Sequence, residues 1–171
     1  TVDTRILGST GNDTFSITEI GVGKSAEIDW GDGNITDGVL SHTYSSGGIY
    51  QISVLNQVDR VKIGGGVSDA DKVLTIDQWG SMKWTTMDSM FSYCGNMQGA
   101  WSDSPNLSNC SSLYYMFGAC DTFNYPINFD AKDNVTTLEA MMNGCISFDS
   151  SFNMSGLGSV SNMGYVLKNC D

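Results

Sequence analysis

Apolar and polar residues follow one pattern in the first part of the chain and another in the second. Up to about residue 64 they alternate with a period of two, so that Tyr50, Ile52 and Val54 would face a core and the residues between them solvent. This period is typical of half-buried antiparallel strands. Strands are predicted near residues 13–20, 25–30, 49–55 and 58–63. The three glycines at 64–66 read as a linker and loosely mark the end of a first domain, residues 1–64.

A repeat with a period of about 25 residues fills the second predicted domain, residues 65–171. Its copies start at Trp84, Cys110, Val135 and Val160, and the last copy is incomplete. Within a copy, apolar residues three and four positions apart predict a short helical turn, and the segment that follows looks extended. One such unit cannot bury its apolar face alone, whereas stacked copies share a continuous core. The Met, Leu and Phe positions are therefore predicted to be core rather than a cofactor site.

The cysteines follow the same repeat. All five lie after residue 93, and four hold one place in successive copies. These four are Cys94, Cys120, Cys145 and Cys170. No two cysteines have the C-x-x-C spacing of a zinc knuckle. We expect a ladder of buried thiols in preference to disulfides, and Cys110 is predicted to fill the core where other copies have Trp or Val.

Charge and composition exclude several classes of function. Eight Lys and Arg against 19 Asp and Glu give a net charge of −11, which repels phosphate backbones and argues against nucleic acid as a partner. A single histidine removes most His-based catalysis and most zinc sites. No apolar run approaches the roughly 20 residues of a membrane-spanning helix, so membrane insertion is not expected.

Three carboxylates form a weak candidate for a metal site. Asp29, Asp32 and Asp37 lie in and around the sequence W-G-D-G and could suggest Ca²⁺. The loop lacks the D-x-D-x-D-G spacing of an EF-hand, because glycines take the ligand places. Asp32 between two glycines fits a turn former that bonds its own backbone. A structural role is therefore favoured over calcium, and no other cofactor is expected.

The sequence contains no arrangement of residues that is typical of a catalytic site. His42 has no Ser or Cys nucleophile at a motif-like spacing, which a catalytic triad requires. No motif identifies a pair of carboxylates that could catalyse glycoside hydrolysis. We expect no catalytic residue and no enzyme, with a carbohydrate-active hydrolase as the least favoured alternative.

Two stretches resemble known families. The W-G-D-G turn at Trp30, the H-x-Y at His42 and the Y-x-I-x-V strand at Tyr50 resemble the PKD domain, a small immunoglobulin-like β-sandwich. The repeats, with M-F-x-x-C at Met90 and again at Met116, resemble BspA-type leucine-rich repeats. Together the resemblances imply an all-β immunoglobulin-like sandwich followed by a short leucine-rich-repeat solenoid, with units of strand and short helix. Such chains occur in bacterial surface proteins and bacteriophage virions.

The resemblance implies a non-enzymatic binding or adhesion module outside the cell, on a cell or virion surface. Its partner would be a protein or glycan on a host or cell surface. The alternative is a structural decoration or assembly protein that contacts neighbouring virion subunits, and an oligomer is possible. A solenoid presents the same position of each copy on one surface, where aromatic residues suit protein or glycan contacts. The candidates for this surface are Trp79, Trp101, Tyr114, Tyr125 and Tyr165.

Overall fold

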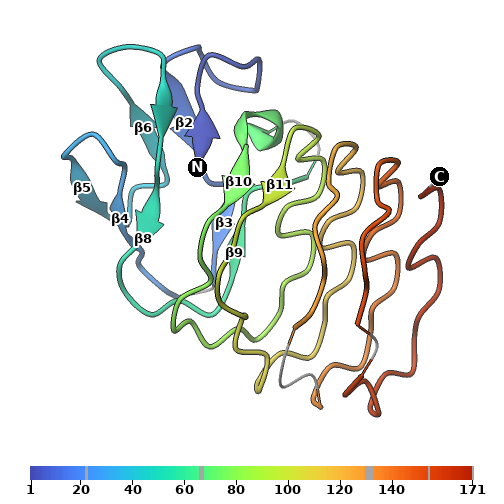
Figure 1. Ribbon diagram of the computed structural model, residues 1–171. Coiled ribbons are helices and arrows are strands. Elements are labelled where there is room, and N and C mark those ends of the chain that lie inside the picture. The colour runs from blue at the N-terminus through green and yellow to red at the C-terminus, as the bar shows by residue number, and fades with distance from the viewer. Residues whose placement is uncertain (22, 66–67, 130–132, 154, 171) are drawn as a thin grey trace.

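Short β-strands make up almost all of the regular structure (Figure 1). In this computed structural model, residues 1–21, 23–65, 68–129, 133–153 and 155–170 are described; Gly66 of the predicted linker lies outside them. The strands are β1 (Val2–Asp3), β2 (Thr14–Ser16), β3 (Glu19–Ile20), β4 (Glu27–Asp29), β5 (Ile35–Asp37), β6 (Ser41–Thr43), β7 (Ile49–Tyr50), β8 (Ser53–Val54), β9 (Val61–Lys62), β10 (Thr75–Ile76) and β11 (Gln98–Gly99). The prediction of an all-β architecture is confirmed. No helix in the described residues is long and apolar enough to cross a bilayer.

All four predicted strand regions contain strands, and the alternation at residues 49–54 is confirmed. Ile49, Gln51 and Ser53 are exposed, whereas their neighbours are half-buried. β1, β5 and β6 were not predicted from the sequence. Their sequences offer little apolar alternation, and Ile35 in β5 is 55% exposed. β5 and β6 form because each pairs with a better-marked strand, β4 and β2 respectively.

Strand pairing joins the two halves of the chain, residues 1–64 and 65–171, side by side. β8 pairs antiparallel with β4, and β4 with β5. β7, two residues before β8, pairs antiparallel with β1, where Val2 lies opposite Tyr50. Val2 also bridges antiparallel to Val73, just before β10, and β10 pairs parallel with β11. The strands therefore follow the spatial order β5, β4, β8 with β7, β1, β10 and β11. β1 is one of the links between the halves.

The W-G-D-G turn, the H-x-Y sequence and the strand at Tyr50 meet in one aromatic cluster of the first half. His42 stacks on Trp30 with ring centroids 5.2 Å apart, and Tyr44 stacks on Tyr50 at 3.7 Å. The Tyr44 hydroxyl donates to the Trp30 carbonyl at 3.0 Å. The indole N–H of Trp30, which is fully buried, donates to the Thr36 hydroxyl at 2.8 Å. The polar groups of the Trp30 and Tyr44 side chains thus have hydrogen-bond partners nearby, which allows these large aromatic side chains to be buried.

Beyond residue 73 the chain winds through successive coils, each hydrogen-bonded to the next through the backbone (Figure 1). Met87 N–H donates to the Ser112 carbonyl at 2.9 Å, and Leu113 N–H to the Thr137 carbonyl at 3.1 Å. The apolar positions of the repeat face the interior, as predicted, and most are fully buried. These are Met87, Met90, Cys94, Met97, Leu113, Met116, Phe117, Cys120, Phe123, Leu138, Met141, Met142 and Cys145. In the last copy, Met163 and Leu167 are 42% and 47% exposed, because no described coil covers them.

The short helix predicted within each unit is wrong. The only helix in the described residues is η1 (Ala70–Lys72), a single 3₁₀ turn before the first coil. Within the coils, every second N–H leaves its own segment: Ser89 donates to the Tyr114 carbonyl of the next coil at 2.9 Å, whereas Met90 donates to the Met87 carbonyl at 3.1 Å. An α-helix would consume both kinds of N–H internally. Two consecutive tight turns replace it, and apolar residues still recur every three or four positions.

Each tight turn contains a residue in the left-handed region of backbone conformation, at two fixed places of the repeat. The first place is occupied by Ser89, Tyr115, Ala140 and Tyr165, with φ between 51° and 61°. The second is occupied by Tyr93, Ala119, Gly144 and Asn169, with φ between 58° and 83°. Non-glycine residues rarely adopt this conformation, so its recurrence shows that stacking of the coils determines the turn.

The repeat cysteines connect one coil to the previous one through their thiols, which confirms the predicted ladder. Cys120 Sγ donates to the Phe91 carbonyl at 3.0 Å, and Cys145 Sγ to the Phe117 carbonyl at 3.0 Å. Cys170 Sγ donates in the same way to the Met142 carbonyl, at 3.1 Å. Burial raises the pKa of the Cys145 thiol to about 12 and that of Cys120 well above its ordinary value. Neutral, buried thiols of this kind pack and donate, and do not act as nucleophiles.

The first half covers the open end of the first coil, and the two halves share one hydrophobic core. Ile63 N–H and Gly64 N–H both donate to the Met90 carbonyl, at 2.9 and 3.1 Å. Gly64 is buried, and a Cβ at this position would clash with the main-chain N and O of Ser92. Reading Gly64 as a linker residue is therefore wrong: it is a glycine because two backbones come into close contact there.

Candidate binding cleft

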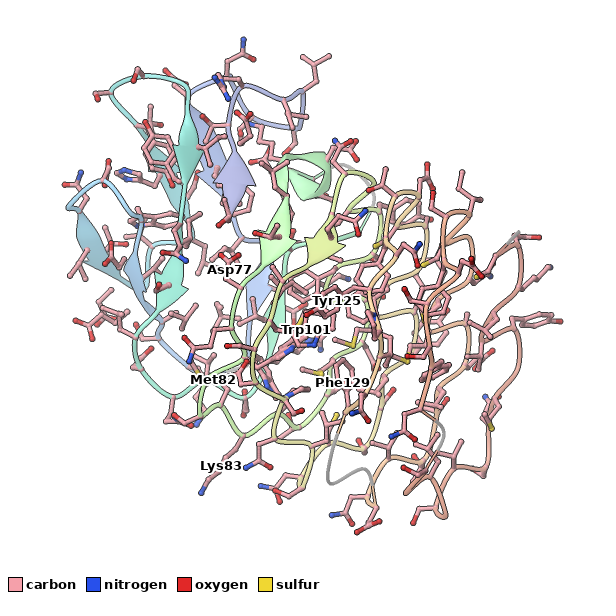
Figure 2. The ribbon with its side chains drawn as sticks, viewed as in Figure 1. Asp77, Met82, Lys83, Trp101, Tyr125 and Phe129 are labelled. Atoms are coloured by element: carbon pink, nitrogen blue, oxygen red, sulfur yellow. The ribbon has the colours of Figure 1, made fainter. Side chains whose placement is uncertain are left out.

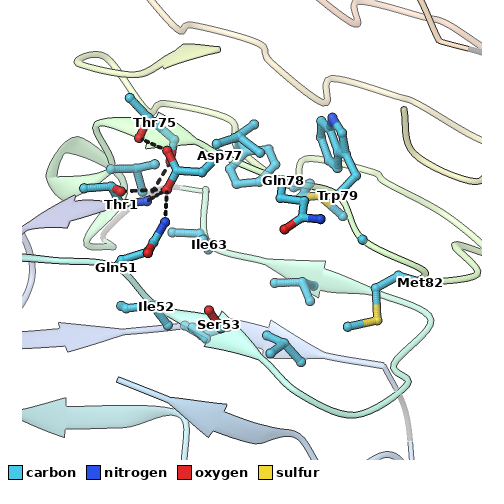
Figure 3. Close-up of a pocket in the computed structure, with 18 of the residues that line it drawn as sticks. Thr1, Gln51, Ile52, Ser53, Ile63, Thr75, Asp77, Gln78, Trp79 and Met82 are labelled. Carbon is cyan, nitrogen blue, oxygen red and sulfur yellow. Dashed lines mark hydrogen bonds and ion pairs between the residues drawn. The ribbon is translucent and has the colours of Figure 1, made fainter. Parts of the chain in front are cut away.

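A cleft of about 480 Å³ lies at the junction of the two halves (Figure 3). One wall is the strand segment at residues 51–55, and the other is the segment at residues 75–82. Apolar side chains from the shared core line the space between the walls, among them Ile17, Val61 and Ile63. Clefts at junctions of this kind, with an apolar base and a few polar groups, are the usual setting of ligand sites.

β1 lies between the two walls at one end of the cleft. β1 separates β7 from the segment before β10 only at its own few residues. Thr1 N donates to the Thr75 carbonyl at 2.8 Å, and Thr1 lines one end of the cleft. The cleft therefore has the width that β1 imposes on its end.

Asp77 is the main polar group at this end. Its Oδ2 accepts hydrogen bonds from the Thr1 hydroxyl at 2.6 Å and from Gln51 Nε2 at 3.3 Å, and its Oδ1 accepts from the Thr75 hydroxyl at 2.6 Å. Partial burial opposes ionisation, but the hydrogen bonds from the Thr1 and Thr75 hydroxyls and the N-terminal ammonium of Thr1, 3.2 Å from Oδ2, outweigh it and lower the pKa of Asp77 to about 2. The carboxylate is therefore ionised at neutral pH, and no Lys or Arg lines the cleft in the described residues.

Two tryptophans contribute to the wall of the second half. Trp79 and Trp84 line the cleft and are 5% and 6% exposed. Their indole N–H groups have no hydrogen-bond partner in the described part of the chain. The turn that holds Trp79 is fixed from the next coil, since Asp103 accepts from the backbone N–H of Trp79 and of Gly80 at 2.9 and 2.8 Å. Both indoles are positioned to report on a ligand through their fluorescence.

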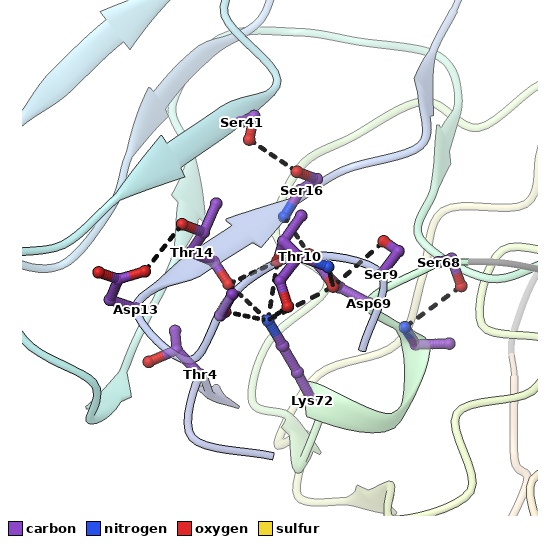
Figure 4. Close-up of polar contacts among 12 residues, drawn as sticks. Thr4, Ser9, Thr10, Asp13, Thr14, Ser16, Ser41, Ser68, Asp69 and Lys72 are labelled. Carbon is purple, nitrogen blue, oxygen red and sulfur yellow. Dashed lines mark hydrogen bonds and ion pairs between the residues drawn. The ribbon is translucent and has the colours of Figure 1, made fainter. Parts of the chain in front are cut away.

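A buried ion pair fixes the first half against the start of the coils (Figure 4). Lys72 Nζ lies 3.4 Å from Asp69 Oδ1, and both side chains are fully buried. Lys72 Nζ donates to the carbonyls of Gly11 and Thr14 at 2.8 and 2.7 Å, and Asp69 Oδ2 accepts from Ser16 N–H at 2.9 Å. Because Lys72 directly precedes Val73, the same pair holds the segment that β1 joins. The buried Lys72–Asp69 pair and its hydrogen bonds therefore hold the segment that leads into one wall of the cleft.

The aromatic residues predicted to form a recognition surface do not gather on one. Trp79 and Trp101, 5% and 9% exposed, are buried, so the expectation that they are exposed is wrong. Tyr125 packs edge-on against Trp101 with ring centroids 4.6 Å apart, and its hydroxyl donates to the Trp101 carbonyl at 3.1 Å (Figure 2). Tyr114 and Tyr165 are 42% and 63% exposed. Of the five candidates, Trp79 alone lines the cleft.

The three candidate calcium ligands have separate partners. Asp29 Oδ1 accepts from Gly31 N–H at 2.9 Å, and Asp37 Oδ1 accepts from the Ser25 hydroxyl. Asp32 bonds Asn34 N–H at 3.0 Å and His42 Nε2 at 2.8 Å. Burial opposes ionisation of Asp32, but the bonds to His42 and Asn34 hold its pKa below the ordinary value. Nowhere in the described residues do three His, Cys, Asp or Glu side chains form a group that could hold a metal ion.

Sequence reasoning missed Gln51 and Asp77, which meet across the end of the cleft (Figure 3). They are 26 positions apart in the sequence, and the hydrogen bond from Gln51 to Asp77 joins the two walls. The alternating pattern at residues 49–55 identified one wall as a strand. Nothing in the sequence indicated that β1 would separate that strand from Thr75.

Comparisons with known proteins identify the second half. A family model described as "Mycoplasma protein of unknown function, DUF285" matches residues 65–171. This match supports the BspA-like resemblance of the repeats. Searches of curated proteins and of solved structures returned no match. Since the match covers more than half of the chain and the whole series of coils, the chain belongs to the DUF285 family.

Proposed function

We propose that the chain is a non-enzymatic extracellular binding module, exposed on a cell or virion surface, that holds a protein or glycan of a host or cell surface. In this proposal residues 1–64 form a PKD-like sandwich and residues 65–171 a leucine-rich-repeat solenoid. The aromatic cluster around Trp30 supports the first assignment, because it unites the motifs that carry the resemblance. The backbone ladder between coils and the DUF285 match support the second.

The cleft at the junction is the observation that carries the proposal. It offers about 480 Å³ between two walls, with an ionised Asp77 at one end and an apolar base. Its walls come from both halves, so both would be needed for binding. A site built on strands and braced by the Lys72–Asp69 pair is positioned more accurately than one on loops.

A blocking variant tests the proposal. Ser81→Trp places a large side chain on the exposed rim of the cleft, and Ser102→Trp, an exposed position outside the cleft, is the matched control. The fluorescently labelled chain is applied to cultured bacterial and animal cells, to a glycan array and to cells treated with protease. We expect retention that S81W abolishes and S102W leaves intact, and loss after protease treatment would identify a protein partner. No retention on any surface, or equal retention of both variants, would contradict the proposal.

A further inference from the structure

We propose that three tyrosines of the coils, Tyr93, Tyr114 and Tyr115, form a second binding surface, which takes an arginine-bearing basic segment of a partner protein. None of the three lines the cleft, so the inference goes beyond the proposed function. Their rings contact one another: the centroids of Tyr93 and Tyr115 are 5.9 Å apart, and those of Tyr114 and Tyr115 are 6.1 Å apart. Tyr93 and Tyr114 are 47% and 42% exposed. These three side chains are called the tyrosine surface below.

The fold does not require tyrosine at two of these positions. Tyr115 and Tyr93 occupy the first and the second left-handed place of the repeat, with φ of 51° and 66°. Elsewhere in the coils the same places carry small residues, namely Ser89, Ala140, Ala119 and Gly144. A bulky aromatic residue is poorly suited to this backbone conformation, and an exposed ring gains little from burial. Strain that packing does not explain points to a function of the side chains themselves.

The backbone ladder between the coils assembles the tyrosine surface. Tyr93 N–H donates to the Gly118 carbonyl at 2.8 Å, which places Tyr93 beside Gly118 of the next coil. The Tyr115 ring lies directly over Gly118, where an added Cβ would clash with it. One face of this ring therefore rests on the backbone of its own turn, and the opposite face is turned outward beside Tyr93.

The fourth copy of the repeat shows which group such a ring binds. Tyr165 occupies the same left-handed place as Tyr115, and the Lys168 ammonium lies over its ring, 4.9 Å from the centroid. The residue that corresponds to Lys168 in the coil of Tyr115 is Gly118, which has no side chain. Among the described residues, no Lys or Arg lies over the Tyr115 ring. Because aromatic faces attract ammonium and guanidinium groups, we expect a partner to supply the cation at this ring.

Carboxylates on both neighbouring coils complement a basic partner. Asp88 and Glu139 hold the same place of the repeat as Tyr114, one coil before it and one coil after it. Asp88 Oδ1 accepts from Tyr114 N–H at 3.1 Å, and Glu139 Oε2 accepts from Asn162 Nδ2 at 2.8 Å. Neither carboxylate forms an ion pair within the described part of the chain. Arginine fits this setting best, because its guanidinium both stacks on aromatic faces and pairs with carboxylates.

Two synthetic peptides test the inference on the full chain. The first is acetyl-Gly-Arg-Gly-Arg-Gly-amide, and the second replaces both arginines with citrulline, which keeps the planar hydrogen-bonding group and removes its charge. NMR of the chain with ¹³C-labelled tyrosine rings follows the seven tyrosines individually. We expect the Arg peptide to shift the signals of Tyr93, Tyr114 and Tyr115 at millimolar concentration. The citrulline peptide should bind about tenfold more weakly, and added salt should weaken the Arg peptide alone.

Tyrosine variants locate the bound peptide. Tyr93→Ala and Tyr115→Ala introduce the residue that the next coil carries at the same place, so we expect both variants to fold. Each should weaken binding of the Arg peptide about threefold. Tyr165→Ala is the matched control, because the Tyr165 ring is already covered by Lys168, and it should bind as the parent chain does.

A charge variant and the cleft variant complete the set. Asp88→Asn keeps an oxygen for the Tyr114 N–H and removes the charge, so it should weaken binding about twofold. Asp149→Asn removes an equal charge at an exposed position of another segment and should have no effect. S81W, which blocks the cleft, should bind the Arg peptide as the parent chain does.

Several results would overturn the inference. An equal response of all seven tyrosines to the Arg peptide would mean attraction to the net charge of −11 alone. Equal binding of the citrulline peptide would exclude recognition of a cation, and loss of binding in S81W would place the peptide in the cleft. Retention on a glycan array that Y115A abolishes, without a response to the Arg peptide, would replace the basic protein by a glycan.

The inference and the proposed function can fail separately. If the labelled chain is not retained on any cell but the Arg peptide binds at the tyrosine surface, only the proposed function of the cleft fails. If S81W abolishes cell binding and no tyrosine responds to the Arg peptide, only the tyrosine surface fails. If Y93A or Y115A does not fold, the comparison of the two peptides on the parent chain, with the tyrosines whose signals shift, still decides the question.

Discussion

The two halves of the chain achieve burial by different means. In the first half, no described strand exceeds three residues, and side chains complete the hydrogen bonding: Trp30 bonds Thr36, and Lys72 enters from outside to bond the loop at residues 10–14. In the coils, the backbone bonds itself, since alternate N–H groups donate to the next coil. Structure in the first half therefore depends on a few irreplaceable residues, whereas in the coils it depends on a pattern that each copy repeats.

This difference predicts how each half tolerates change. Stacked coils distribute their stability over nearest-neighbour contacts, so one altered position affects one interface between coils. A polar network concentrates stability in a few contacts, so loss of one buried partner leaves others unsatisfied. The cleft lies between the halves and depends on both kinds of support.

The largest effect is expected for Lys72→Met. The substitution leaves the fully buried Asp69 without its cation and removes the donors to Gly11 and Thr14, which should destabilise the chain by about 3–5 kcal/mol. Urea unfolding followed by tryptophan fluorescence measures the loss. Arg5→Met is the control, because Arg5 pairs with Asp3 at 2.8 Å on the exposed surface and should matter little. Equal effects of the two variants would show that the buried network is not the support inferred here.

A smaller effect is expected for Gly64→Ala, at the contact between the halves. The added Cβ meets the backbone of Ser92, which cannot rotate away as a side chain would, and the expected cost is about 1–3 kcal/mol. Gly158→Ala is the matched control, since a Cβ there meets no atom within 4 Å. Thermal unfolding of both variants gives the comparison. If G64A is as stable as G158A, the first half does not cover the first coil as closely as described.

The thiols of the coils give a third test, at alkaline pH. Burial raises the pKa of Cys110 from 9.0 to about 11, so the folded chain keeps this proton where the unfolded chain loses it. The contribution is fully present below pH 9 and is lost as the pH rises through about 11. Cys110→Val, the residue of two other copies at this place, should change little at pH 7. At pH 11 it should be more stable than the parent by about 1–2 kcal/mol. Identical pH profiles in urea unfolding would contradict the shift.

Structural features that recur in several copies could be predicted from the sequence, whereas features that depend on a single contact could not. The period of about 25 residues, the buried Met and Phe positions and the cysteine ladder are each supported by several copies, and the structure confirms them. The helical turn was wrong because consecutive tight turns bring residues three and four apart to one side, as a helix does. Residue types did not reveal the left-handed positions, since Tyr115 and Ala140 share one of them.

The cleft was beyond sequence reasoning for a related reason. Gln51 and Asp77 have no pattern in common, and β1 places them opposite one another through the contacts of Thr1. Trp79 and Trp101 were expected to be exposed, but the first half and the neighbouring coils cover them, which no local pattern reports. Contacts of this kind join segments that are far apart in the sequence. They do not recur from copy to copy, so no repeated sequence pattern indicates them.

The smallest expected effect tests whether stacking determines the left-handed turns. Gly144 and Ala119 occupy the same place in adjacent coils, with φ of 83° and 58°. An alanine in this region costs roughly 1–2 kcal/mol, and part of this is offset because glycine loses about 0.5–1 kcal/mol more conformational entropy on folding. Gly144→Ala should therefore destabilise by about 0.5–1 kcal/mol, without a clash, since the nearest atom to an added Cβ is Ala119 Cα at 3.5 Å.

Ala119→Gly is the reverse substitution and should stabilise by a similar amount, as measured by urea unfolding of the pair. If both changes destabilise, the side chain at this place is needed for packing between the coils. If neither has an effect, the turn relaxes and the left-handed conformation is not imposed by the ladder. Opposite signs in the two variants would mean that the backbone of each coil is fixed by its neighbours, whichever residue occupies the turn.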